Sequence, residues 1–150
     1  MKRTVVILVL IFLSFFSRPL LAQDEQKEVM QVVQQFFRTM EQNDSVAYRH
    51  MFLPDACTYY IQQDQGSVRT GGRPALDFKF SKDRIIKERF RDKTVEIQVS
   101  RNIAMVAGAY DLWVNDKFSH CGTDVFTLLK TQDGWKISSL SYSINKDGCE

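Results

Sequence analysis

The sequence predicts an α+β domain in which N-terminal helices cover one face of a curved antiparallel sheet. Apolar residues at helical spacing occur from about residue 25 to residue 43. Segments in which apolar and polar residues alternate dominate from residue 94 onward. The turn signals Asn115-Asp116 and Asp133-Gly134 separate the last three of these segments, as in consecutive hairpins. Helices followed by hairpin-connected strands are typical of the α+β class. With 150 residues, 44% of them hydrophobic and 25% charged, the composition fits one globular domain and excludes a disordered chain.

The first 22 residues predict an export signal. Lys2 and Arg3 precede an apolar run over residues 4–16, and a small residue ends the segment before an abrupt change to polar residues. We expect residues 1–22 to be a signal peptide, so that the domain comprises residues 23–150 and is periplasmic or secreted. The apolar run is too short to span a bilayer comfortably, and no stable membrane span is expected after cleavage. An uncleaved membrane anchor is the alternative.

Charge and motif content limit the possible partners and cofactors. Three of the 20 basic residues precede residue 23, which leaves 17 basic against 18 acidic residues and no basic field for nucleic acid. The chain has only two histidines and no Cys-x-x-Cys or His-x-x-x-His spacing. It also lacks a glycine-rich phosphate loop. The sequence therefore predicts neither a metal nor a cofactor.

The helical region begins with one long amphipathic segment from about residue 25 to residue 43. Its apolar positions form one broad stripe, which consists of Val29, Val32, Val33, Phe36, Phe37 and Met40. Asp44 or Ser45 can cap a second, shorter helix that Pro54 ends.

The rest of the chain is mainly strand. Residues 63–73 are rich in turn-forming residues, 74–80 fit a short helix, and 84–90 fit either a helix or a strand. The strands are expected over residues 56–62, 94–99, 103–114, 118–130 and 135–144.

Strand register suggests a polar site within an apolar surface. If Asn115-Asp116 is a two-residue turn, Asp111 lies opposite His120, and Asp124 shares their face because it is four residues from His120 on the same strand. If the second loop has two or four residues, Asp124 faces Ser141 or Ser143. Ionisable groups in apolar surroundings suit general acid–base chemistry, so we expect a catalytic set of Asp111, His120 and Asp124 in which Asp111 orients His120. The alternative is that Asp111 and His120 only satisfy each other at the rim of the sheet.

The same reasoning predicts a ligand pocket and an interface. The expected ligand-binding residues are aromatic or hydroxyl-bearing: Phe37, Tyr59, Trp113, Phe126 and Ser141. Both faces of the predicted sheet are substantially apolar, whereas a half-solvated sheet has one polar face. We therefore expect a homodimer through the outer sheet face.

Three cysteines in an exported chain allow at most one internal disulfide. Cys121 and Cys149 can pair if the tail folds back over the last strands, although their register leaves them out of alignment. Cys57 is expected to be a small buried hydrophobic residue. A nucleophilic Cys121 activated by His120 is disfavoured, because adjacent strand residues point to opposite faces.

Several segments resemble a known superfamily. They are Val29–Phe37, Leu53–Ala56, Ala109–Trp113, Lys117–Phe126 with its His-Cys-Gly sequence, Asp133–Ile137 and Tyr142–Cys149. Over residues 25–149 the chain resembles the nuclear transport factor 2-like superfamily, in particular its SnoaL-like and "putative lumazine-binding" bacterial groups. The resemblance implies a cone-shaped, cystatin-like fold with a pocket between the helices and the curved sheet, and often a dimer.

Fold alone does not choose a function within this superfamily. We expect an exported protein that binds a small organic ligand in an apolar pocket bearing Asp and His groups. One alternative is a non-catalytic dimeric scaffold. The other is a cofactor-independent isomerase, dehydratase or hydrolase that uses Asp–His acid–base chemistry.

Overall fold

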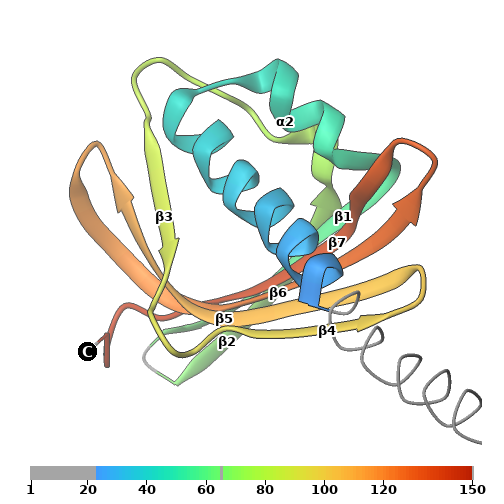
Figure 1. The fold of residues 1–150 in the computed structure, drawn as a ribbon. Helices are drawn as coiled ribbons and strands as arrows, with labels where there is room; N and C mark the ends of the chain where they lie inside the picture. Colours follow the sequence, from blue (N-terminus) through green and yellow to red (C-terminus); the bar gives the residue numbers. More distant parts are fainter. Residues whose placement is uncertain (1–22, 65, 150) are drawn as a thin grey trace, which may run out of the picture.

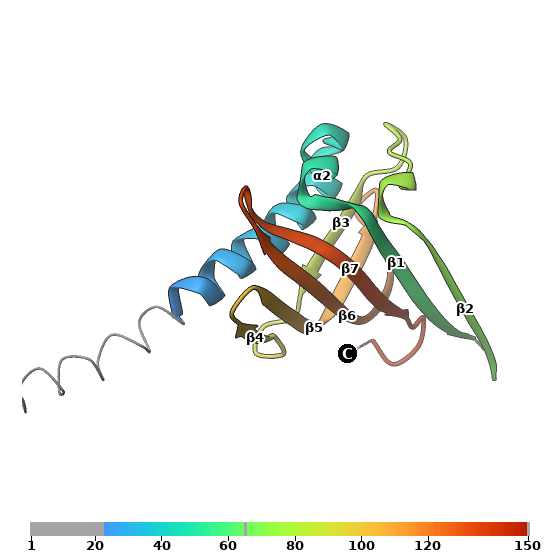
Figure 2. The same cartoon turned by 90° about the vertical axis from the view of Figure 1, so that its right-hand side faces the viewer.

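The structure is a computed structural model that describes residues 23–64 and 66–149. A long N-terminal helix, residues 23–42, crosses the concave face of a strongly curved sheet (Figures 1 and 2). A short helix, α2 (Ser45–Met51), follows it and leads directly into the first strand. The predicted signal peptide, residues 1–22, lies outside the described residues. No helix within the two described ranges is long and apolar enough to cross a membrane.

The sheet has seven strands: β1 (Phe52–Asp64), β2 (Ser67–Pro74), β3 (Ile86–Phe90), β4 (Glu96–Ser100), β5 (Ile103–Val114), β6 (Lys117–Thr131) and β7 (Gly134–Ile144). Their order is β2-β1-β7-β6-β5-β3, and β4 also pairs with β5. All pairings are antiparallel except that of β1 with β7, which is parallel. The sheet is therefore mixed, whereas a wholly antiparallel sheet was expected. Strand β1 begins beside the start of β7, with Phe52 opposite Ile137, so the two strands run in the same direction.

The two helices form where the sequence predicts them. Val29 and Val33 are fully buried, and Phe36 is only 3% exposed, so the apolar stripe of the long helix faces the sheet. Asn43 takes a left-handed conformation that ends this helix. The Asp44 side chain then accepts hydrogen bonds from the backbone N–H groups of Val46 and Ala47 and caps α2.

The glycine-containing segment before Pro74 is a strand, although its composition suggested a turn. Gly71 and Gly72 lie opposite Tyr60 and Tyr59 in the β1–β2 ladder. A Cβ atom at either glycine would collide with the ring of its neighbouring tyrosine. These glycines thus make room for aromatic rings within a ladder. Among the described residues of this segment, the turn is at Gly66, which has a positive φ.

The short connection after β2 contains a single turn of 3-10 helix, η1 (Ala75–Asp77). It covers only part of the helix suggested for residues 74–80. The ambiguous segment over residues 84–90 contains strand β3.

Two β-bulges decide which residues face the helices. One interrupts the β5–β6 ladder between Leu112 and Trp113, so that His120 pairs with Leu112 instead of Asp111. The other interrupts the β6–β7 ladder next to Leu128 and places Tyr142 opposite Asp124. We call the helix-covered surface the inner face and the opposite surface the outer face.

The core fills the space between the long helix and the inner face. Phe36 is at its centre, with its ring 5.3–6.0 Å from the rings of Phe37, Tyr48, Phe52 and Phe126. Most of these ring pairs meet edge to face, which is a favoured geometry for aromatic side chains. This packing holds the helices against the sheet and leaves a hollow beside the core, towards β3 and the β5–β6 hairpin.

Candidate functional site

The hollow beside the core is a cavity of about 350 Å³ between the two helices and the inner face. Its walls are mainly aromatic and aliphatic, and it also receives a small set of polar side chains. The lining residues are Phe36, Met40, Tyr48, Thr58, Tyr60, Gly72, Arg73, Phe78, Arg84, Ile86, Glu88, Tyr110, Leu112, Val114, Ser119, His120, Asp124, Leu140, Tyr142 and Ile144. Its size and composition are within the range of small-molecule sites.

Two carboxyl groups form the buried polar part of this cavity. Glu88 on β3 is 8% exposed and Asp124 on β6 is 1% exposed. Oδ2 of Asp124 is buried and has no hydrogen-bond donor among the described residues when both groups are ionised. A hydrogen bond between the two carboxyls, which requires a proton on one of them, would satisfy it.

Burial makes both acids hold their protons. Loss of hydration raises the pKa of Glu88 to about 8, and the hydrogen bond with Asp124 opposes part of this rise. Burial, the adjacent Glu88 charge and the same hydrogen bond all raise the pKa of Asp124. The two acids therefore titrate as one coupled pair that holds its protons more tightly than free carboxyl groups do. At neutral pH the pair retains at least one proton that it can donate to a ligand.

Two tyrosine hydroxyls near the carboxyl pair are engaged by the backbone. The Tyr110 hydroxyl donates to the carbonyl oxygen of Ser143 at 2.7 Å, and the Tyr48 hydroxyl donates to that of Ala75 at 3.2 Å. Burial raises the pKa of both phenols, so they remain neutral. Their fixed hydroxyls orient the rings as cavity walls.

Gly122 is required for this arrangement of Tyr110. A Cβ atom at this position would collide with the ring of Tyr110 and with the carbonyl oxygen of Ser143. The glycine therefore lets the Tyr110 ring cross β6 and reach its acceptor on β7.

Basic groups occupy the more exposed part of the lining. Arg73 and Arg84 are exposed, and His120 is half-buried. Nδ1 of His120 lies 3.0 Å from the Ser119 hydroxyl. Burial lowers the pKa of His120, and the positive charges of Arg84 and Lys146 lower it further, so this imidazole is neutral at pH 7.

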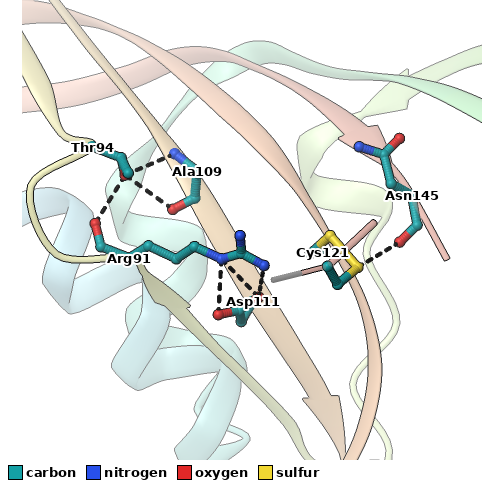
Figure 3. Close-up of polar contacts among 7 residues, drawn as sticks. Arg91, Thr94, Ala109, Asp111, Cys121 and Asn145 are labelled. Carbon is teal, nitrogen blue, oxygen red and sulfur yellow. Dashed lines mark hydrogen bonds and ion pairs between the residues drawn. A yellow bond between two sulfur atoms is a disulfide. The ribbon is translucent and has the colours of Figure 1, made fainter. Parts of the chain in front are cut away.

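Of the predicted catalytic set, His120 and Asp124 line the cavity and Asp111 does not. Asp111 lies on the outer face, where its carboxylate receives hydrogen bonds from Nε and Nη2 of Arg91 (Figure 3). The closest of these distances is 2.7 Å, and both side chains are about one-quarter exposed. The expectation that Asp111 orients His120 is wrong, because the bulge in the β5–β6 ladder places them on opposite faces.

None of the five predicted ligand-binding residues lines this cavity. Phe37 and Phe126 belong to the packed core. Tyr59 and Ser141 line a separate, open hollow on the outer face, and Trp113 packs against Phe118 with ring centroids 5.9 Å apart. The bulge in the β6–β7 ladder explains Ser141, because it turns Leu140 and Tyr142 inward instead.

Glu88 is the main residue that the sequence reasoning missed. It alternates with Ile86 and Phe90 in β3, which indicates a shared face. The segment was compatible with a helix as well as a strand, and its many charges favoured a solvated surface. The apolar residues on either side of Glu88 were the available signal for an inward carboxylate.

A disulfide joins Cys121 on β6 to Cys149 in the C-terminal tail, with Cα atoms 5.7 Å apart. The backbones of Cys121 and Asn145 exchange two hydrogen bonds. Sγ of Cys149 also contacts the carbonyl oxygen of Asn145. Figure 3 shows the disulfide at Cys121 beside Asn145. Cys57 is a free, half-buried thiol. The tail is thereby fixed to β6 immediately beside His120.

No group of three or more His, Cys, Asp or Glu side chains that could hold a metal ion occurs within residues 23–64 and 66–149. The polar groups of the cavity are instead suited to hydrogen bonding and proton transfer with an organic ligand.

Comparison with solved structures identifies the fold. A nuclear transport factor 2-like protein from Salmonella enterica serovar Typhimurium superposes with a TM-score of 0.62 at 15% identity, over 85% of this chain and 96% of that one. A protein from Novosphingobium aromaticivorans described as having a cystatin-like fold gives a TM-score of 0.64 at 13% identity, over 91% and 92% of the two chains. A Streptomyces avermitilis protein described as a "putative dehydratase" gives 0.58 at 16% identity, over 82% and 97%. These likenesses confirm the nuclear transport factor 2-like, cystatin-like fold expected from the sequence.

A comparison with curated proteins gave no match. Residues 24–143, however, match the family described as "Putative lumazine-binding". This match covers most of the described domain, including Glu88, His120 and Asp124. The chain is a member of this family described as "Putative lumazine-binding", and its fold is nuclear transport factor 2-like.

Proposed function

We propose that this protein binds a small planar organic molecule in the cavity that contains Glu88 and Asp124. The observation that carries the proposal is the pair of buried carboxyl groups, Glu88 and Asp124, in the wall of a cavity of about 350 Å³. Buried polar groups are costly unless their hydrogen-bonding capacity is used, and a ligand group that hydrogen-bonds with the pair would use the capacity that the bond between the two carboxyls leaves free. Family membership supports ligand binding in general.

The cavity walls suit a flat, unsaturated ligand. The rings of Tyr48, Tyr110 and Tyr142 line the space, together with aliphatic side chains such as Leu112 and Leu140. Aromatic and aliphatic walls favour an apolar ring system, while the protonated carboxyl pair can donate to a carbonyl oxygen. We therefore expect the ligand to combine an apolar ring with an oxygen acceptor.

The test uses 2-acetylnaphthalene, which has a flat ring system and one carbonyl acceptor. Its affinity for the purified protein is measured by calorimetry, with two variants for comparison. Val114→Phe places a larger side chain in the cavity wall, whereas Val68→Phe makes the same change at an exposed site on β2 that does not line it.

We expect the wild type and Val68→Phe to bind the ketone equally, and Val114→Phe to bind at least tenfold more weakly. A folded wild-type protein that binds no ketone would refute the proposal. Equal affinity for all three proteins would place the binding elsewhere and also refute it. Native mass spectrometry of protein purified from its own host would show which molecule co-purifies.

Catalysis by proton transfer is a second candidate function, and the buried carboxyl pair favours it. Glu88 in its ionised form can remove a proton from the carbon next to a carbonyl, while Asp124 donates its proton to the carbonyl oxygen to give the neutral enol. Reversal in D2O would introduce deuterium into the methyl group of 2-acetylnaphthalene, as measured by proton NMR. We expect Glu88→Gln to abolish this exchange, and unchanged exchange in that variant would refute the candidate.

Export and self-association complete the proposal. We propose that residues 1–22 are removed on export to the periplasm or beyond, which mass determination of the protein from its host tests. We also propose a homodimer through the outer face, where Tyr59 and Ile61 are 51% and 46% exposed beside an apolar hollow. We expect Ile61→Asp to convert the dimer to a monomer in sedimentation velocity, and a monomeric wild type would refute the dimer.

A further inference from the structure

The charged side chains of the cavity are divided by depth. Glu88 and Asp124 are buried, whereas Arg73 and Arg84 are exposed and mark the mouth. The buried acids are largely protonated at neutral pH, while arginine is always charged. A molecule entering the cavity at pH 7 therefore meets positive charge first and neutral hydrogen-bonding groups further in.

Neither mouth arginine forms a salt bridge within residues 23–64 and 66–149. The guanidinium of Arg73 lies over the ring of Phe78, 5.1 Å from its centroid. This cation–π contact holds the group in place but does not neutralise its charge. The charge also acts inside the cavity, since it opposes the effect of burial on the pKa values of Tyr48 and Tyr142.

The part of the mouth next to His120 has the same sign. Arg84 lies close enough to His120 to lower the pKa of that imidazole, and Lys146 in the C-terminal tail does the same. A cationic ligand would be repelled by this surface, whereas an anionic group could accept hydrogen bonds from an arginine.

Resting on the proposed function, we propose that the ligand is an unsaturated or aromatic carboxylate with a second oxygen at its far end. Its carboxylate is held at the mouth by Arg73 and Arg84. Its ring lies between the tyrosine walls, and its far oxygen hydrogen-bonds with the pair formed by Glu88 and Asp124.

The test compares three probes that share one ring system and one far hydroxyl: 6-hydroxy-2-naphthoate, its neutral carboxamide, and the corresponding aminomethyl cation. Affinities are measured by calorimetry for the full chain and for Arg73→Gln and Arg84→Gln. Arg69→Gln is the matched control, because Arg69 is also exposed on β2 but does not line the cavity.

We expect the naphthoate to bind at least tenfold more tightly than the carboxamide, and the cation to bind most weakly. Arg73→Gln and Arg84→Gln should each remove most of the preference for the carboxylate and leave the affinity for the carboxamide unchanged. Arg69→Gln should keep the preference. Binding of the carboxamide also shows that each variant is folded.

Equal binding of carboxylate and carboxamide would overturn the inference and leave the proposed function intact, as would a preference for the cation. A preference for the carboxylate that survives both cavity substitutions would also overturn it. Failure of the folded wild type to bind any of the three probes would instead count against the proposed function itself.

Discussion

Replacement of Glu88 by glutamine tests whether the buried acid holds a proton in the native state. Its pKa rises from 4.5 to about 8 because burial penalises the carboxylate. At about 1.4 kcal/mol for each tenfold change in proton affinity, this rise corresponds to at most about 5 kcal/mol of stability. Between these two pH values the native state binds a proton that the unfolded chain has released, so the free energy of unfolding falls as the pH rises.

The assay is urea unfolding of the purified protein at a series of pH values from 6.5 to 8. His120 has a lowered pKa and gives the opposite slope, but this slope fades within about one pH unit above its ordinary value of 6.5. We therefore expect the free energy of unfolding of the wild type to fall across this window by about 2 kcal/mol from Glu88 alone, and by up to about 4 kcal/mol when the proton held by Asp124 is included.

Glu88→Gln should lose at least half of this slope, because the amide does not titrate. The double variant Glu88→Gln/Asp124→Asn should have none of it, since Asp124 is the other acid with a raised pKa. A wild type whose stability is constant from pH 6.5 to 8 would refute the reasoning. So would a slope that persists in the double variant.

Three further predictions concern the framework of the site. Cys149→Ser opens the disulfide with Cys121, whose sequence separation is 28, and should lower the free energy of unfolding by about 3–4 kcal/mol under non-reducing conditions. Gly122→Ala should cost about 1–3 kcal/mol or more in denaturant unfolding, because the added methyl group collides with the backbone carbonyl oxygen of Ser143 and with the Tyr110 ring. Asp111→Asn removes an ion pair on the outer face, so it should lower stability by about 1 kcal/mol or less and leave the affinity for 2-acetylnaphthalene unchanged.

Each of these predictions has a result that contradicts it. Equal stability of Cys149→Ser and the wild type would mean that the disulfide does not constrain the unfolded chain. An unaffected Gly122→Ala variant would mean that neither Tyr110 nor the backbone of Ser143 needs the space beside this glycine. Loss of binding of 2-acetylnaphthalene in Asp111→Asn would mean that Asp111 does contribute to the ligand site.

The helices and the hairpins were predictable because their signals are local. The apolar stripe around Phe36 specifies the buried face of a helix without reference to any other part of the chain. Asn115 and Asp116 both adopt positive φ angles, as a two-residue hairpin loop of type I′ requires, and Val114 pairs with Lys117 as expected. The parallel pairing of β1 with β7 is a long-range contact, and no local residue pattern specifies it.

The carboxyl groups differ in how far their positions could be inferred. Asp124 alternates with Phe126 and Leu128 on one strand, and both of these residues are fully buried. Residues two positions apart on one strand lie on the same face, whatever the neighbouring strands do. The inward position of Asp124 therefore followed from the sequence alone.

The face on which Asp111 lies could not be inferred from β5 alone. Both the odd-numbered and the even-numbered positions of this strand are apolar, so its own pattern does not identify an inner face. The position of Asp111 was inferred across the hairpin from His120, and such an inference holds only while the ladder is regular. The bulge beside Leu112 adds one residue to β6 and thereby reverses the result. The acid that accompanies Asp124 in the cavity is consequently Glu88 from β3, and the two carboxyls share one buried environment although 35 residues separate them in sequence.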